Sequence, residues 1–202
     1  MNYKAPIGFC LLLAACGGGG GAPILGADAT YDEAEVAYAE LFDEVDVIFQ
    51  REGVLQTVDA PNAVKTYSGL VIGEGSDFPF DGPTIGYAAN LELEVDFNLG
   101  DIEGELTNYT TNLAGFTNPE GTMNLVGGLG TDIDGFTSAN FGGSTTLTNG
   151  AVSADASVFG EGNFTAGGAE AAFGFVFSDF VWVTGPDAGT TSFADGIYDA
   201  VE

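Results

Sequence analysis

The chain of 202 residues contains no histidine, and its only cysteines are Cys10 and Cys16. A Ser-His-Asp triad, a Cys-His pair and a His/Cys zinc site are therefore excluded as functional centres. Cations are scarce too, since three Lys and Arg residues stand against 30 Asp and Glu, giving a formal net charge of −27. Such a chain repels nucleic acid and anionic membrane surfaces, because they carry the same sign of charge. We expect no nucleic-acid partner, no metal site and no cofactor.

The excess of carboxylates has two explanations. An acidic surface keeps a protein soluble in a saline habitat, where salt screens the repulsion between its charges. Alternatively, part of this surface is an acidic patch directed at a basic partner or a divalent cation.

Residues 1–15 are predicted to be a signal peptide. Lys4 supplies the positive start, and the apolar stretch 7–13 is far shorter than the roughly 20 residues of a membrane-spanning helix. The stretch ends on Leu-Ala-Ala-Cys, which resembles a bacterial lipobox, and this resemblance implies that Cys16 is lipidated and becomes the new N-terminus. An ordinary secretory signal with a chance cysteine is the alternative.

Residues 16–29 are then the lipidated cysteine and a glycine-rich tether, of the flexible kind that lets an anchored domain stand off a membrane. Cys10 would leave with the signal peptide and Cys16 would carry lipid, so no thiol would remain for a disulfide, a metal or a nucleophile. Gly17 occupies the place of the inner-membrane retention aspartate, which by analogy with other lipoproteins favours the outer membrane.

Residues 30–52 are predicted to form an amphipathic helix. Thr30 followed by Glu33 is the pattern of a capping box, and Gly53 marks the end. Apolar residues recur at spacings of three and four along one face, namely Tyr38, Leu41, Phe42, Val45, Ile48 and Phe49. We expect this face to pack on the rest of the domain.

From residue 64 onward the hydrophobic period changes to two, with a turn signal about every ten residues. We predict a small antiparallel β-barrel of eight strands over residues 64–183, its interior filled by phenylalanine, and a polar C-terminal tail at 184–202. Nine segments carry strand signals, one more than such a barrel needs, namely 66–73, 91–97, 101–107, 110–117, 122–129, 131–137, the two flanking Asn149-Gly150, and 171–182. Asp132-Ile133-Asp134-Gly135 is interpreted as a turn, because it lacks most of a calcium loop.

The hairpin near Leu99-Gly100 predicts an unusual surface. A two-residue turn there pairs Val95 with Gly104 and places all the apolar side chains of both strands on one face. Carboxylates then face each other across the other side, Asp96 against Glu103 and Glu94 against Glu105, which is destabilising unless salt or a cation relieves it. By the same logic Asn149-Gly150 pairs Leu147 with Val152.

Residues 162–177 hold one carboxylate within a run of small residues between aromatic stretches. We expect Phe164 and the series Phe173, Phe175 and Phe177 to lie on neighbouring strands with their rings on one face. Glu170 is predicted to fold its carboxylate onto free backbone N–H groups of the intervening turn and so to lock it.

The same residues resemble the C-terminal signature of the transferrin-binding protein B type of lipoprotein barrels. Gly162, Phe164, Ala169, Glu170, Gly174 and Phe175 match that signature, and Asp96 and Phe97 match an earlier strand that ends in Val-Asp-Phe. The resemblance covers one barrel, whereas the transferrin-binding members have two lobes, and Thr165-Ala166 replaces their usual Tyr-Gly. It implies a lipid-anchored barrel that binds a protein, without implying that transferrin is the ligand.

We therefore expect a monomeric lipoprotein, anchored in the outer membrane at the cell surface or in the periplasm, that binds a protein or an iron-bearing or other solute. The alternative is a lipocalin-like carrier with an apolar small molecule inside the barrel, which requires small inward residues at one mouth. An enzyme is not expected, since only a chance carboxylate pair could serve a glycosidase. A membrane-spanning barrel is disfavoured, because the acidic face would line a narrow lumen with almost no cations to pair.

Overall fold

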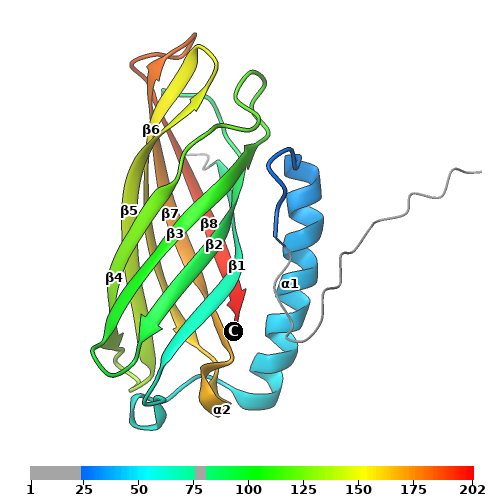
Figure 1. The fold of residues 1–202 in the computed structure, drawn as a ribbon. Helices are drawn as coiled ribbons and strands as arrows, with labels where there is room; N and C mark the ends of the chain where they lie inside the picture. Colours follow the sequence, from blue (N-terminus) through cyan, green and yellow to red (C-terminus); the bar gives the residue numbers. More distant parts are fainter. Residues whose placement is uncertain (1–23, 76–80) are drawn as a thin grey trace, which may run out of the picture.

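The computed structural model of the protein describes residues 24–75 and 81–202. Eight antiparallel strands form a closed barrel in sequence order, and the last strand pairs with the first. One long helix lies beside the barrel wall (Figure 1). The predicted mainly β fold, an eight-stranded barrel with one N-terminal helix, is confirmed. The signal peptide and Cys16 lie outside the described residues.

The strands follow one another with short connections, apart from two longer segments, residues 76–86 between the first and second strands and residues 112–122 between the third and fourth. Their bounds are β1 Val64–Gly75, β2 Tyr87–Asp96, β3 Asp101–Thr111, β4 Met123–Thr131, β5 Thr137–Asn149, β6 Val152–Phe164, β7 Ala171–Thr184 and β8 Thr191–Val201. A short 3-10 turn, η1 Thr57–Asp59, and a one-turn helix, α2 Ala166–Ala169, lie between elements.

Helix α1, Tyr31–Glu52, has the ends that the sequence predicts. The Glu33 amide donates to the Thr30 hydroxyl at 3.2 Å, and the Thr30 amide donates to the Glu33 carboxylate at 2.9 Å, completing the capping box. At the other end Gly53 adopts a φ of +75°, and its amide donates to the Phe49 carbonyl. In the described part of the chain, no helix is long and apolar enough to cross a membrane.

The apolar face of α1 packs on the outside of the barrel. Its buried residues are Tyr31, Ala34, Tyr38, Leu41 and Val45, and they share a hydrophobic cluster with outward-facing residues such as Leu70 of β1 and Val201 of β8. The protein therefore has two cores, one inside the barrel and one between α1 and the barrel wall.

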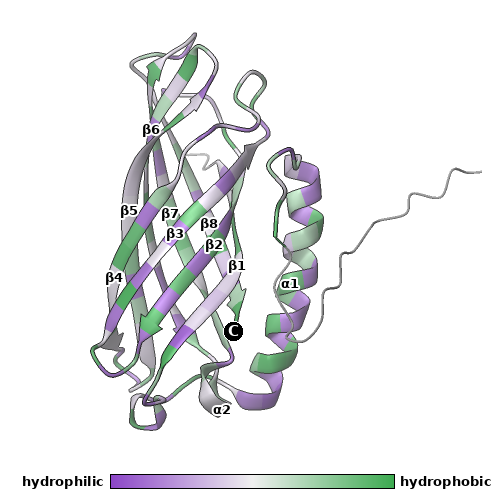
Figure 2. Cartoon of the chain, viewed as in Figure 1, coloured by the Kyte–Doolittle hydropathy of each residue, from purple (hydrophilic) through white to green (hydrophobic). Residues whose placement is uncertain are grey.

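Hydrophobic and hydrophilic residues alternate along β2 and β3 (Figure 2), and the burial of these residues places the hydrophobic ones inside and the carboxylates outside. The register differs from the prediction by two residues, since Val95 pairs with Ile102 and Glu94 pairs with Glu103. The connection is a four-residue turn rather than a two-residue turn, because the Asp96 carboxylate accepts the amides of Asn98 and Leu99. A shift of two keeps every side chain on its predicted face, so like charges still lie opposite each other.

The hairpin between β5 and β6 is also shifted by two residues, in the opposite direction, and it keeps a two-residue loop. Asn149 pairs with Val152, so the loop is Gly150-Ala151, and Leu147 faces Ala154 instead of Val152. Gly150 has a φ of +59°, which is the positive value that such a tight loop requires.

Two expected strands are wrong. Residues 112–117 leave the sheet after β3 because Phe116 turns inward, is fully buried and packs on Trp182, closing one end of the barrel. The other segment, 131–137, mostly forms the turn between β4 and β5. Asp132 there accepts the amides of Asp134 and Phe136, as its interpretation as a turn predicted.

The segment 184–202, expected to be a polar tail, supplies β8 and closes the barrel. Its inward positions are mostly small, among them Ser192, Ala194 and Ala200, and this weak apolar signal conceals the strand in the sequence.

Candidate functional site on the outer face of the barrel

The inside of the barrel is filled with large side chains. The largest fully buried residues inside it are Trp182, Tyr67, Tyr87, Tyr198, Phe116, Phe141, Phe164 and Phe180. Their rings pack edge to face or at a tilt, with centroid separations from 4.9 to 5.5 Å. Packing is so close that a Cβ atom added at Gly160 would lie 2.4 Å from the Phe141 ring. Among the described residues, the inward side chains therefore fill the space that a carrier would need for its ligand.

Strand β7 separates its aromatic residues between two faces. Phe164 on β6 is opposite Ala172, so it shares the inner face with Val176, Phe180 and Trp182. Phe173, Phe175 and Phe177 lie at the alternate positions and point outward, so the expectation that they share a face with Phe164 is wrong.

The outward residues form a continuous surface feature, which we call the outer aromatic strip and define as Ile72, Phe159, Phe175, Phe177 and Ile197. Strand pairing aligns Phe175 with Ile197 and Ile197 with Ile72, while Phe177 lies opposite Phe159. Phe175 is 59% exposed, and Phe159, Phe177 and Ile197 are between 37% and 47% exposed. Clustered exposed rings of this kind are typical of interaction surfaces.

Carboxylates border the outer aromatic strip on both sides. Glu161 pairs with Phe175 in the β6–β7 register, and Asp195 pairs with Phe177 on β8. Glu74 of β1 lies opposite Asp195, and all three of these residues are exposed. Shallow hollows flank Phe175, one lined by Glu161 and Asn163 and the other by Glu74 and Asp195.

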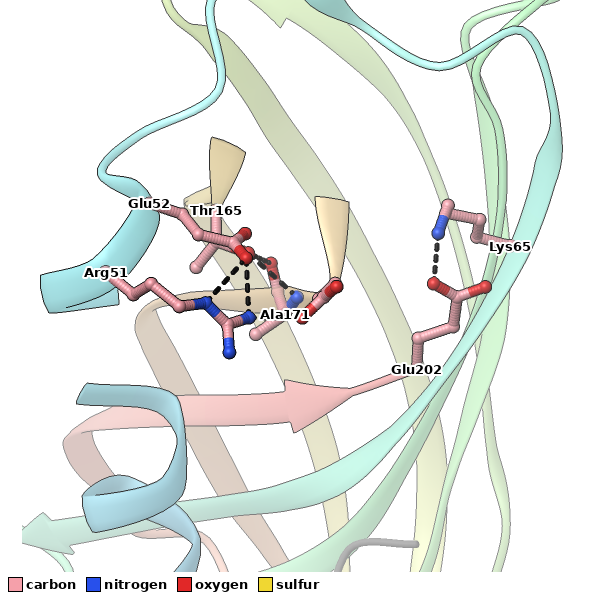
Figure 3. Close-up of polar contacts among 7 residues, drawn as sticks. Arg51, Glu52, Lys65, Thr165, Ala171 and Glu202 are labelled. Atoms are coloured by element: carbon pink, nitrogen blue, oxygen red, sulfur yellow. Dashed lines mark hydrogen bonds and ion pairs between the residues drawn. The ribbon is translucent and has the colours of Figure 1, made fainter. Parts of the chain in front are cut away.

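The two basic residues of the described chain, Arg51 and Lys65, neutralise none of these carboxylates. Arg51 at the end of α1 donates to Glu52 and, at 2.7 Å, to Glu170, and Lys65 pairs with Glu202 (Figure 3). The carboxylates that border the outer aromatic strip therefore form no ion pair with a basic residue of the described chain.

The prediction that Glu170 locks its own turn is wrong. Its carboxylate binds Arg51 rather than the backbone of its own turn, so it ties α1 to the barrel. The turn is held by Thr165, whose hydroxyl accepts the Ala171 amide at 3.0 Å and whose own amide donates to the Ala171 carbonyl. Figure 3 shows these residues beside the Arg51–Glu52 pair.

Most other residues of the sequence signature lie near the Arg51–Glu170 contact and make packing contacts within the barrel. Gly162 lies directly opposite Gly174, and a Cβ atom on Gly162 would lie 2.4 Å from the Tyr198 hydroxyl, so this glycine makes room for an inner ring. Phe164 meets Phe97 edge to face at 5.1 Å, which brings the two signature segments into contact. The Ala169 carbonyl accepts the hydroxyl of Tyr67, whereas Asp96 shapes the β2–β3 turn.

A buried carboxylate that the sequence pattern does not reveal lies where α1 meets the barrel. Asp199 points outward from β8 beneath α1, is 4% exposed and accepts the Tyr38 hydroxyl. Loss of hydration on burial raises the pKa of Asp199 to about 6, and the hydrogen bond from Tyr38 only partly opposes this. The one signal in the sequence is the capped helix itself, which must cover some outward-facing residues of the barrel.

No family model and no curated protein matches this chain. The resemblance to the transferrin-binding protein B type of barrel therefore remains a prediction from short motifs.

Proposed function

We propose that this protein is a lipid-anchored binding module of the outer membrane that captures a protein partner on the outer aromatic strip. The barrel acts as a rigid support, and the residues after Cys16 act as its tether. The proposal rests on the two faces of β7, since Trp182 and Phe180 fill the inside of the barrel while Phe175 and Phe177 face solvent.

The chemistry of the strip selects the partner. Exposed rings contribute most to binding when a partner covers them from water, as at the centres of protein interfaces. Glu74, Glu161 and Asp195 around them favour a surface that carries lysine and arginine, and they speed its approach. A second copy of this chain would bring the same carboxylates together, so the strip favours a different, basic protein.

The carrier alternative receives less support. It requires a cavity inside the barrel, and that space is occupied by packed aromatic side chains. The hollows beside Phe175 are on the outer surface and are too open to bury most of an apolar molecule.

The test is a capture experiment in the native environment with the full-length chain. We compare the wild type with the double variant Phe175→Ser/Phe177→Ser, and with Leu99→Ser as a control, because Leu99 is also exposed, at 74%, but lies in the β2–β3 turn. We expect one basic protein to be recovered by the wild type and by Leu99→Ser, and lost with the double variant. Equal recovery by all three, or recovery of only a small solute or an iron-bearing molecule, would contradict the proposal.

A further inference from the structure

The seam between α1 and the barrel contains a crevice with aromatic walls and a carboxylate at its base. Phe42 and Phe49 of α1 and Phe173 of β7 line it, and Asp199 of β8 lies beneath them. Phe49 and Phe173 meet edge to face with centroids 5.5 Å apart, while Phe42 is 49% exposed at the opening. The crevice has a volume of about 200 Å³, several times the roughly 30 Å³ that one water molecule takes up in the liquid.

The crevice is negatively charged and lacks a cation. Asp46 and Asp199 both line it, and their hydrogen-bond partners are neutral, since Gln50 donates to Asp46 at 3.2 Å and Tyr38 donates to Asp199. The basic residues of the described chain are held in ion pairs elsewhere.

We propose that this crevice binds an alkylammonium group, that is, an ammonium head on a short apolar stem. Ring faces attract a cation by roughly 0.5 to 2 kcal/mol each, depending on how far water is excluded, and aromatic pockets bind quaternary ammonium groups in this way. Asp199 adds a full negative charge close to the rings, in a place where water screens it weakly. The group can belong to a free amine or to a lysine side chain. The inference does not depend on the outer aromatic strip.

A proton and the ammonium group compete for the Asp199 carboxylate, because protonation removes the negative charge that attracts the ligand. The groups that face Asp199 are Tyr38 and Asp46 from α1, Leu70 from β1 and Phe173 from β7, and Asp46 is the one other carboxyl among them. Burial raises the pKa of Asp199 to about 6, so at pH 5 only about a tenth of the molecules carry the charge. Binding should therefore be close to tenfold weaker at pH 5 than at pH 7.5.

The experiment titrates the full-length chain with choline and follows binding by NMR line broadening and calorimetry. The uncharged isostere 3,3-dimethyl-1-butanol reports what shape and hydrophobicity contribute without charge. Nα-acetyl-lysine methylamide represents a lysine of a protein partner, so its affinity relative to choline distinguishes the two sources of the ammonium group.

Three variants locate the binding. Asp199→Asn keeps an acceptor for the Tyr38 hydroxyl while removing the charge, and we expect at least about tenfold weaker binding of choline. Phe42→Leu removes an exposed ring without opening the core, and we expect about threefold weaker binding. Glu105→Gln removes an equal charge from an exposed position on β3 and should leave binding unchanged.

The proposal is overturned if the alcohol binds as well as choline, or if Glu105→Gln weakens choline binding as much as Asp199→Asn does. The first result would mean that hydrophobicity alone fills the crevice, and the second that cations merely gather around an acidic protein. Because the comparison with the alcohol uses the wild type and Phe42→Leu leaves the core intact, the test holds even if Asp199→Asn folds poorly.

Discussion

The burial of Asp199 should make the stability of this protein depend on pH in a way that one substitution removes. An ordinary aspartate has a pKa near 3.8, and burial beneath α1 raises that of Asp199 to about 6 in the folded state. Between these two values the folded protein holds a proton that the unfolded chain has released, so the free energy of unfolding falls as pH rises.

The size of the effect follows from the difference in pKa. A difference of about two pKa units, at about 1.4 kcal/mol per unit, makes the ionised carboxylate cost about 3 kcal/mol above pH 6 and nothing below pH 4. This figure is an upper limit, because the acidic unfolded chain also raises the pKa of its own carboxyls. Asp199→Asn removes the charge but keeps an acceptor for Tyr38, so the variant should gain up to this amount at pH 7.5 and little at pH 4.

The assay is urea unfolding of the wild type and Asp199→Asn, followed by circular dichroism at several pH values from 4 to 8. The other carboxylates are common to both proteins, so they cancel in the difference between the two free energies. A difference that stays constant across this range would rule out the buried charge of Asp199 as its cause, because a purely structural effect of the amide does not titrate.

Further predictions concern the core, the acidic face and the anchor. Trp182→Ala should lower the free energy of unfolding by about 3 to 5 kcal/mol, whereas Phe175→Ala should change it by less than about 0.5 kcal/mol, as measured by the same urea unfolding. The opposed pair Glu94 and Glu103 should make the melting temperature rise with added salt or calcium, and Glu94→Gln should raise it at low salt by relieving a few tenths of a kcal/mol; a melting temperature indifferent to both would remove this electrostatic explanation. Cys16→Ser should abolish incorporation of radiolabelled palmitate and release the protein from the membrane fraction, and continued labelling would argue against the lipobox.

Local signals in the sequence define much of the fold. The capping box at Thr30 and Glu33 and the apolar spacing after it locate α1. The alternation from Leu91 to Val95 identifies β2 and its inner face. In both cases the periodicity is strong because one face is buried and the other is wet.

Other features depend on tertiary contacts that a periodic pattern does not encode. A register shifted by two residues leaves every face unchanged, so the hydrophobic pattern does not select the four-residue turn, which is held by local hydrogen bonds such as those of the Asp96 side chain. Strand β7 is apolar on both faces, and its alternation therefore does not reveal whether Phe175 or Val176 points inward. The crevice at Asp199 is assembled from α1, near the start of the described chain, and from β7 and β8 at its other end, so no local pattern in the sequence reveals it.

Cysteine labelling along β7 tests most directly whether its phenylalanine side chains face solvent. In a chain carrying Cys10→Ser and Cys16→Ser, single variants Phe175→Cys, Val176→Cys and Phe177→Cys are exposed to a maleimide in the folded state and again after unfolding. We expect rapid labelling of the folded protein at 175 and 177 and protection at 176 until the protein unfolds. Rapid labelling at 176 together with protection at 175 and 177 would contradict this expectation, because the aromatic strip would then line the inside of the barrel.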